Sequence, residues 1–174
     1  MQTLAVDCGG TGIKAAVLSS SGKVIKELTY VKTPYPITPQ KLISIIADFL
    51  NQTKGVKRLT VGLPGMIRGG KVVVIPHYVN PKGPRTKASN ELRNFWYGFD
   101  MQKALAKKFK LPTLVLNDAE IHGAAVISGK GLELVLTFGT GLGSAIYMDG
   151  KLAPHLEISH FTVRAGRTID MWIG

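Results

Sequence analysis

A glycine-rich turn between two apolar runs is the feature that most constrains the fold of this chain. The stretch DCGGTGIK (residues 7–14) separates TLAV from AAVL, two runs typical of strands. A plain two-residue hairpin turn needs only a pair of the Asn-Gly kind. This turn also holds an acid, a hydroxyl and a lysine, which indicates a binding role in addition to reversing the chain.

Phosphate is the ligand that this composition favours. Exposed backbone N–H groups in such a turn form an anion-binding concavity, and glycine lets a phosphate approach without a clash from Cβ. A carboxylate at Asp7 could hold Mg²⁺ through water. The candidate phosphate ligands of this turn are Gly9, Gly10, Thr11, Gly12 and Lys14.

A second turn with the same chemistry lies in FGTGLGSA (residues 138–145). One such turn alone is more typical of a simple hairpin. Two turns that both carry Gly-Thr-Gly favour phosphate binding, and the candidates here are Gly139, Thr140, Gly141 and Gly143. By contrast, GMIRGGKV (residues 65–72) matches a P-loop only superficially, because Val72 replaces the hydroxyl and a strand follows where a helix should begin.

Hydrophobic patterning predicts an α/β fold with a mixed sheet. Three strands at 2–8, 13–19 and 23–32 form an antiparallel meander, and a helix begins at Thr38-Pro39 and ends at Gly55. We expect residues 77–98 to be an irregular, basic loop. The remaining predicted elements are strands at 58–65, 71–76, 113–118, 132–139 and 143–152, and helices at 101–110 (capped by Asp100), 119–128 and from 167.

Two domains follow from this order: a lobe at 1–116 and the incomplete beginning of a second lobe at 117–174. The second region offers too few strands to bury both faces of a sheet. We therefore expect either a fragment of a longer protein or a homodimer in which a second copy covers that face.

Composition and charge narrow the class of protein. The chain has 174 residues, 45% of them hydrophobic, and a single cysteine, Cys8. No apolar run reaches the roughly 18 to 20 residues of a membrane span, and no signal peptide is recognisable. These features predict a cytoplasmic protein without a disulfide framework or a cysteine-based zinc site.

The net charge of +11 is concentrated in residues 1–116, which hold 18 Lys and Arg but only 5 Asp and Glu. Such a balance is compatible with polyanionic partners, namely nucleotide phosphates, polyphosphate or nucleic acid. A merely solvated, basic surface explains the charge equally well.

Polar residues in the second half are candidates for binding a polyhydroxylated ligand. Asn117 and Asp118 end a buried strand and open a helix, where α/β sheets place ligands; Asp118 could instead be an ordinary N-cap. Glu157 and His160 are three residues apart and can point the same way.

The sequence resembles the ROK sugar kinases of the actin/hexokinase-like superfamily, and most closely the polyphosphate/ATP glucokinases. The stretches that carry the resemblance are VDCGGTGIKAAVL, VGLPGMI and LNDAEIHGAAVISGKGLELVLTFGTGLGSAIYMDGKLAPHLEISH. The resemblance covers residues 3 to 160. It implies a ribonuclease H-like first lobe and a second, similar lobe that closes over glucose and the phosphoryl donor.

The resemblance also implies roles for individual residues. Asp7 and its glycine turn form the first phosphate motif with Mg²⁺, and Gly139–Gly143 form the second. Asp118 is the general base that accepts the proton of the sugar hydroxyl. The implied sugar ligands are Pro64, Gly65, Asn117, Asp118, Glu157 and His160.

The chain departs from the family pattern in three places. The cysteine-rich zinc motif is absent, so no zinc is expected. The region 77–98 is longer than in relatives, and its Trp96 matches their tryptophan while their sugar-contacting asparagine has no assignable counterpart. The chain also stops before the adenosine motif.

We therefore expect a glucokinase-type phosphotransferase that uses ATP or polyphosphate, or a fragment of one. Three alternatives compete: a sugar-sensing ROK regulator, for which no helix-turn-helix precedes residue 7; a ribonuclease H-like nucleic-acid-processing domain, which needs more clustered carboxylates; and a non-catalytic sugar-binding protein. Nucleic acid and membrane are not expected partners.

Overall fold

The computed structural model describes residues 1–28, 30–138 and 141–173, apart from the side chains of residues 160, 170 and 173. The chain forms two compact units, Met1–Leu116 and Asn117–Gly174.

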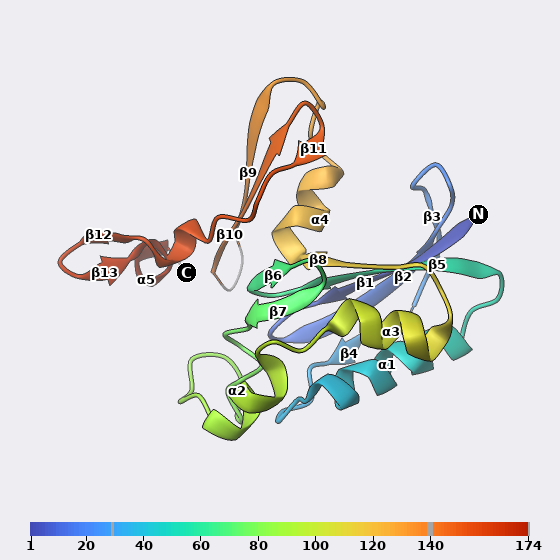
Figure 1. Cartoon of the computed structure of the whole chain (residues 1–174), viewed down its shortest axis with the longest axis horizontal. Coiled ribbons are helices and arrows are strands. Elements are labelled where there is room, and N and C mark those ends of the chain that lie inside the picture. The colour runs from blue at the N-terminus through green and yellow to red at the C-terminus, as the bar shows by residue number, and fades with distance from the viewer. Residues whose placement is uncertain (29, 139–140, 174) are drawn as a thin grey trace. The chain divides into compact units, whose positions relative to one another are not determined.

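A six-stranded mixed sheet is the centre of the first unit (Figure 1). Its central strand, β1, is antiparallel to β2 and parallel to β5, so that Val6 lies between Ala15 and Val61. This arrangement confirms the predicted α/β class with a mixed sheet. The strands in spatial order are β3 (Val24–Glu27), β2 (Gly12–Leu18), β1 (Gln2–Cys8), β5 (Val56–Leu63) and β8 (Thr113–Asn117), and β4 (Val31–Lys32) also pairs with β2.

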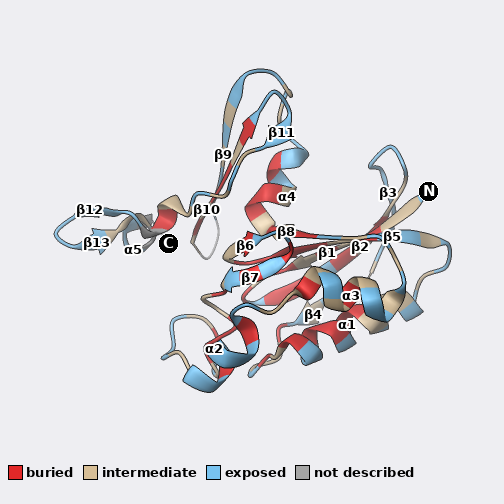
Figure 2. Cartoon of the chain, viewed as in Figure 1, coloured by how far each residue is buried: buried red, intermediate tan, exposed pale blue. Residues whose placement is uncertain are grey.

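Two helices cover one side of this sheet: α1 (Pro39–Asn51) and α3 (Met101–Phe109) (Figure 1). Apolar side chains of α1 recur at helical spacing and are buried. They pack with Met101 and Leu105 of α3 and with the inward residues of β1 and β5 into one hydrophobic core (Figure 2).

The predicted starts of α1 and α3 are confirmed. The side chain of Thr38 accepts a hydrogen bond from the N–H of Lys41, 3.2 Å away, and Pro39 follows it at the first helical position. The Asp100 carboxylate caps α3 in the same way. However, α1 ends at Asn51, before the predicted stop at Gly55, which instead has a φ of +77° in the turn that leads to β5.

Residues 77–98 are not wholly irregular, and our prediction was wrong here. They contain α2 (Asn90–Trp96), which Ser89 caps by accepting a hydrogen bond from the N–H of Leu92. The helix is anchored by Trp96, which is fully buried and donates from Nε1 to the carbonyl oxygen of Ile37, 2.9 Å away. A helix of only seven residues leaves a faint periodic signal in the sequence.

Other predicted boundaries also shift. The single strand expected at 23–32 is two strands, β3 and β4, and both pair with β2. The P-loop-like stretch forms a hairpin of β6 (Met66–Arg68) and β7 (Lys71–Val74), as its apolar β-branched residues predict.

The second unit consists of a helix, a three-stranded antiparallel sheet and short C-terminal elements. In the sheet β10 pairs with both β9 and β11. The predicted helix at 119–128 is shorter: it begins at Asp118 and ends at Ala124. The elements are α4 (Asp118–Ala124), β9 (Leu132–Phe138), β10 (Leu142–Met148), β11 (Lys151–Leu152), the 3₁₀ helix η1 (Ile158–His160), β12 (Thr162–Arg164), β13 (Arg167–Thr168) and α5 (Ile169–Ile173).

The helix α4 packs closely on this sheet because two glycines remove side chains from the contact. A Cβ on Gly123 would lie 2.8 Å from the ring of Tyr147. A Cβ on Gly143 would lie 2.9 Å from the Cβ of Ala119 and 2.3 Å from the hydroxyl of Thr137. Gly143 therefore has a packing role whatever else it does.

Candidate active site

The glycine turn of the first unit is held by hydroxyl groups that come from elsewhere in the chain. Thr33 Oγ1 donates to the carbonyl oxygen of Gly9 at 2.8 Å, and the hydroxyl of Tyr78 donates to the same oxygen at 3.3 Å. The hydroxyl of Tyr35 donates to the carbonyl oxygen of Gly10 at 2.7 Å. The oxygen of the next residue, Thr11, accepts from Tyr30 and from the N–H of Thr33.

The carbonyl groups of Gly9, Gly10 and Thr11 are thus hydrogen-bonded within the protein. The backbone N–H groups of the turn are the groups that could bind a ligand. The N–H of Gly9 donates to the oxygen of Gly12. None of the described residues accepts a hydrogen bond from the N–H of Gly10 or Thr11. Outward N–H groups of consecutive residues attract anions.

Charged side chains flank this turn on neighbouring strands. Asp7, near the end of β1, is paired with Lys14 of β2, so both side chains lie on the same face of the sheet. Lys14 is exposed and Asp7 is half-buried. A cation and a carboxylate therefore lie next to the glycine turn.

The donor set around the turn is compatible with magnesium. Mg²⁺ usually takes only one or two protein carboxylates and completes its shell with phosphate oxygens and water. Asp7 supplies one carboxylate next to the proposed phosphate position. Among the described residues there is no group of three His, Cys, Asp or Glu side chains that could hold a metal by themselves.

The Pro64-Gly65 turn lies at the same edge of the sheet as the glycine turn. It follows β5, whose Gly62 is in register with Asp7 of the parallel strand β1. Gly65 has a φ of +92°, and a Cβ there would lie 2.4 Å from the carbonyl oxygen of Val74. Only glycine fits this position, which fixes the backbone of the turn in one conformation.

In the second unit, Asn117 rather than Asp118 caps α4. The Asn117 side chain accepts from the N–H groups of Ala119 and Glu120, and the Glu120 carboxylate accepts from the N–H of Asn117 at 2.9 Å. This reciprocal pair is a capping box. Asp118 is the first helical residue, and its Oδ1 accepts a hydrogen bond from the N–H of Ala119 at 2.9 Å.

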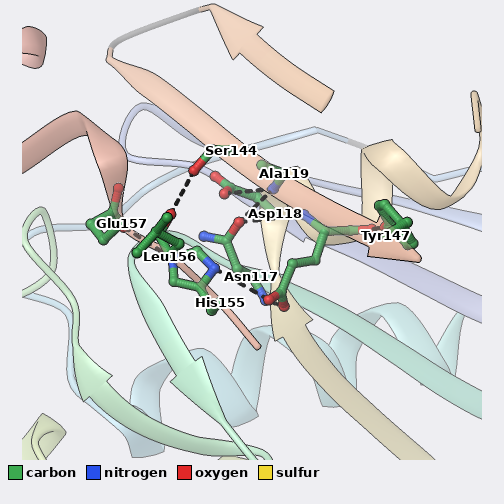
Figure 3. Close-up of polar contacts among 9 residues, drawn as sticks. Asn117, Asp118, Ala119, Ser144, Tyr147, His155, Leu156 and Glu157 are labelled. Atoms are coloured by element: carbon green, nitrogen blue, oxygen red, sulfur yellow. Dashed lines mark hydrogen bonds and ion pairs between the residues drawn. The ribbon is translucent and has the colours of Figure 1, made fainter. Parts of the chain in front are cut away.

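The Glu120 carboxylate begins a chain of ionisable groups that continues through His155 and Glu157; the latter two are labelled in Figure 3. Oε1 of Glu120 is 3.2 Å from Nδ1 of His155, whose Nε2 is 3.3 Å from Oε2 of Glu157. Ser159 donates to the other oxygen of Glu157. The hydrogen bonds to Glu120 and Glu157 raise the pKa of His155 from 6.5 to about 9.

The structure describes some of the predicted site residues of the second unit and not others. Asn117, Asp118 and Glu157 belong to the region of α4 and the segment that precedes η1. Gly141 immediately precedes β10, and Gly143 is the second residue of that strand. Gly139 and Thr140 lie outside the described residues, as does the side chain of His160.

Sequence reasoning missed four residues of this candidate site: Tyr35, Tyr78, Glu120 and His155. The spacing Asn-x-x-Glu at residues 117–120 is a capping-box signal that could have identified Glu120. His155 lies two residues before Glu157 but carries no motif of its own. The two tyrosines are far from the turn in sequence, and no local pattern connects them to it.

Comparison with known proteins shows the family of the chain. The ROK family model matches residues 3–157. The chain belongs to the ROK family. This confirms the resemblance on which the sequence prediction relied. In the described part of the chain, no helix combines the length and apolar character that a membrane crossing requires.

Relatives in the family include sugar kinases of more than one specificity. The polyphosphate glucokinase of Mycobacterium leprae (strain TN) is 31% identical over 166 residues, which are 91% of this chain and 47% of that protein. The N-acetylmannosamine kinase of Escherichia coli (strain SE11) is 29% identical over 157 residues, 87% of this chain and 49% of that protein. The chain thus spans about half the length of these curated relatives.

The fold of the chain is also that of solved ROK kinases. The inorganic polyphosphate/ATP-glucomannokinase from Arthrobacter sp. strain KM matches with a TM-score of 0.78 and 28% sequence identity. The match covers 98% of this chain and 67% of that chain.

Proposed function

We propose that this chain carries the phosphate- and sugar-binding residues of a sugar kinase that transfers a phosphoryl group from polyphosphate or ATP to the 6-hydroxyl of glucose. The observation that carries the proposal is the glycine turn, whose carbonyl groups are bonded by Thr33, Tyr35 and Tyr78 and whose amides are left for an anion. The two compact units then correspond to the first lobe and part of the second lobe of a kinase.

The phosphate groups of the donor bind to the amides of Gly10 and Thr11, and the Lys14 ammonium offsets part of their negative charge. Asp7 holds a magnesium ion through water. When bound, Mg²⁺ neutralises phosphate charge. In the second unit, Gly139, Thr140, Gly141 and Gly143 are the residues that we propose as a second phosphate motif.

We assign sugar-binding residues to each unit separately. Asp118 accepts the proton of the attacking hydroxyl as the new bond to phosphorus forms. The capping box holds the start of α4, and with it Asp118, in one position. Asn117, Glu157, His160 and the Pro64-Gly65 turn provide hydrogen bonds that orient the sugar ring.

The substitution Asp118→Asn tests this assignment. Asparagine keeps the shape of the side chain and an oxygen for the N–H of Ala119, but it cannot accept a proton. We expect phosphoryl transfer to fall by about 10²- to 10⁴-fold while glucose binding, measured by calorimetry, persists. Asp149→Asn is the matched control, since Asp149 is exposed in the turn after β10. Equal activity in both variants would contradict the role of Asp118.

The same assay identifies donor and acceptor. Polyphosphate and ATP are compared as donors, because the excess of basic residues in the first unit is compatible with a long polyanion. Glucose and N-acetylmannosamine are compared as acceptors, because relatives of both kinds match the chain. A cytoplasmic location and a homodimer stay predictions.

A non-catalytic sugar-binding protein is the main alternative. Glucose binding without turnover by any donor would favour it. The described residues hold no cluster of metal-binding side chains, so nothing in this part of the chain favours the nuclease alternative.

A further inference from the structure

His155 is buried between two carboxylates that come from different parts of the second unit. Its side chain is 2% exposed, and that of Glu120 on α4 is 3% exposed. Glu157, in the segment before η1, is 16% exposed and is the end of the chain of groups that reaches solvent. The order is therefore a buried carboxylate, a buried imidazole and a partly accessible carboxylate (Figure 3).

This geometry requires a protonated imidazole. A neutral histidine has one N–H and can donate to one carboxylate only, whereas the imidazolium donates from both nitrogens. Here Nδ1 is within hydrogen-bonding distance of Glu120 and Nε2 is within the same distance of Glu157. The raised pKa of His155, about 9, agrees with a charged ring at neutral pH.

Stability alone does not account for such a cluster. Removing charged groups from water has a large free-energy cost, and a buried ion pair seldom stabilises a fold more than apolar residues of the same size would. The capping box is already complete with Asn117 and Glu120, so the helix does not need His155 to begin. Buried groups with shifted pKa values gather at functional sites.

The effect of His155 is on the carboxylate of Glu157. One oxygen of that carboxylate faces Nε2 of His155 and the other accepts from Ser159. These two donors, on different residues, fix the plane of the carboxylate. A carboxylate has about four lone-pair sites, so one held by these donors can also accept hydrogen bonds from the hydroxyl groups of a sugar.

We propose that His155 is a positioning residue that links the start of α4 to Glu157 and holds the Glu157 carboxylate ready to accept hydrogen bonds from hexose hydroxyls. The inference rests on the proposed function, because it takes Glu157 as a sugar ligand. The proposal adds His155 to the residues that form the sugar site. It also requires that the substrate present hydroxyl donors to the Glu157 carboxylate.

A double-mutant cycle on the 174-residue chain tests this link. The variants are His155→Gln, Glu157→Gln and the double variant, with His122→Gln as the matched control because His122 is exposed on α4. Glucose affinity is measured by calorimetry, and folding is checked by circular dichroism. A hydrogen bond to a charged group is worth about 1.5–3 kcal/mol, so we expect His155→Gln to weaken glucose binding by about 10- to 100-fold.

The decisive quantity is the coupling energy between His155 and Glu157 in glucose binding, rather than the loss of affinity in His155→Gln alone. If His155 acts through Glu157, the double variant binds glucose no more weakly than Glu157→Gln alone. Losses that add, or an unchanged affinity in His155→Gln, would overturn the inference while leaving the proposed function intact. Absence of glucose binding by the parent chain would overturn both.

A measurement on the parent chain covers the case in which His155→Gln fails to fold. The charged groups facing His155 are Glu120 and Glu157, and the neighbouring Tyr147 hydroxyl donates to the carbonyl oxygen of Glu120. Burial raises the pKa of Tyr147, so it stays neutral. Glucose affinity should then fall as the pH rises through about 9, where His155 loses its proton. An affinity that is constant from pH 7 to 10 would overturn the inference.

Discussion

The hydroxyl of Tyr35 donates a 2.7 Å hydrogen bond to the carbonyl oxygen of Gly10, so a side chain from the loop after β4 orients the peptide of the glycine turn. This peptide unit joins Gly10 to Thr11, and its N–H belongs to the pair of amides that we assign to phosphate. When the carbonyl is bonded to Tyr35, the N–H points the opposite way.

Tyr35→Phe should therefore weaken binding of the phosphoryl donor. The loss of one hydrogen bond of about 0.5–1.5 kcal/mol corresponds to about a 2- to 10-fold rise in the donor Kd. Glucose affinity should stay unchanged, because the substitution touches the phosphate turn alone. Calorimetry with polyphosphate and with ATP measures the effect.

Tyr97→Phe is the matched control for this substitution, since Tyr97 is exposed after α2. Burial also raises the pKa of Tyr35 to about 12, so the Tyr35 hydroxyl keeps its proton at pH 10. An equal change of donor affinity in both variants would show that Tyr35 does not orient the turn.

The burial of Trp96 leads to a prediction about stability. Trp96→Phe removes the donor to the carbonyl oxygen of Ile37 and leaves a gap beside Tyr78, whose ring centroid lies 5.3 Å away. An unsatisfied buried acceptor and a partly filled cavity together cost about 2–4 kcal/mol. Urea unfolding of the purified chain gives the free energy of unfolding directly.

The neighbouring residue provides the comparison for Trp96. Phe95 is 45% exposed, and Phe95→Leu should change the free energy of unfolding by no more than about 0.5 kcal/mol. Similar losses in the two variants would mean that Trp96 does not anchor the segment between β7 and α3.

The pKa of His155 predicts how stability depends on pH. Its folded pKa of about 9 lies above the model value of 6.5, so protonation favours the folded state. This contribution is fully present below about pH 6.5 and is lost as the pH rises through about 9. The parent chain should therefore exceed His155→Gln in stability at pH 6 by more than it does at pH 10.

Urea unfolding at several pH values measures that difference. The difference in free energy of unfolding between the parent chain and His155→Gln cancels the contributions of the other titrating groups, which both chains share. A gap that is the same at pH 6 and at pH 10 would mean that His155 is not charged in the folded protein.

Much of the fold could be predicted from the sequence because helix caps and turns depend on residues that are close together along the chain. The Thr38-Pro39 start of α1, the Asp100 cap of α3 and the glycine turn after β1 each depend on residues within a few positions of one another. The mixed sheet followed from the order of these elements. Helix ends were less predictable: α1 and α4 end earlier than the sequence suggested, since a helix terminus depends on packing as well as on propensity.

The residues that complete the candidate site depend on contacts between distant parts of the chain. Glu120 and His155 are 35 positions apart, and Tyr78 lies 69 positions from Gly9. No periodicity or spacing rule relates such pairs, so neither the partners of the turn nor the buried imidazolium could be read from the sequence.

The sequence by itself determined the family of the protein and predicted a phosphate site at the glycine turn, because both depend on short contiguous motifs. Only the tertiary structure decided which groups orient that turn and that His155 lies beside Glu157. These assignments require the folded chain, because hydrogen bonds and buried charges depend on distance in space and not on distance along the chain.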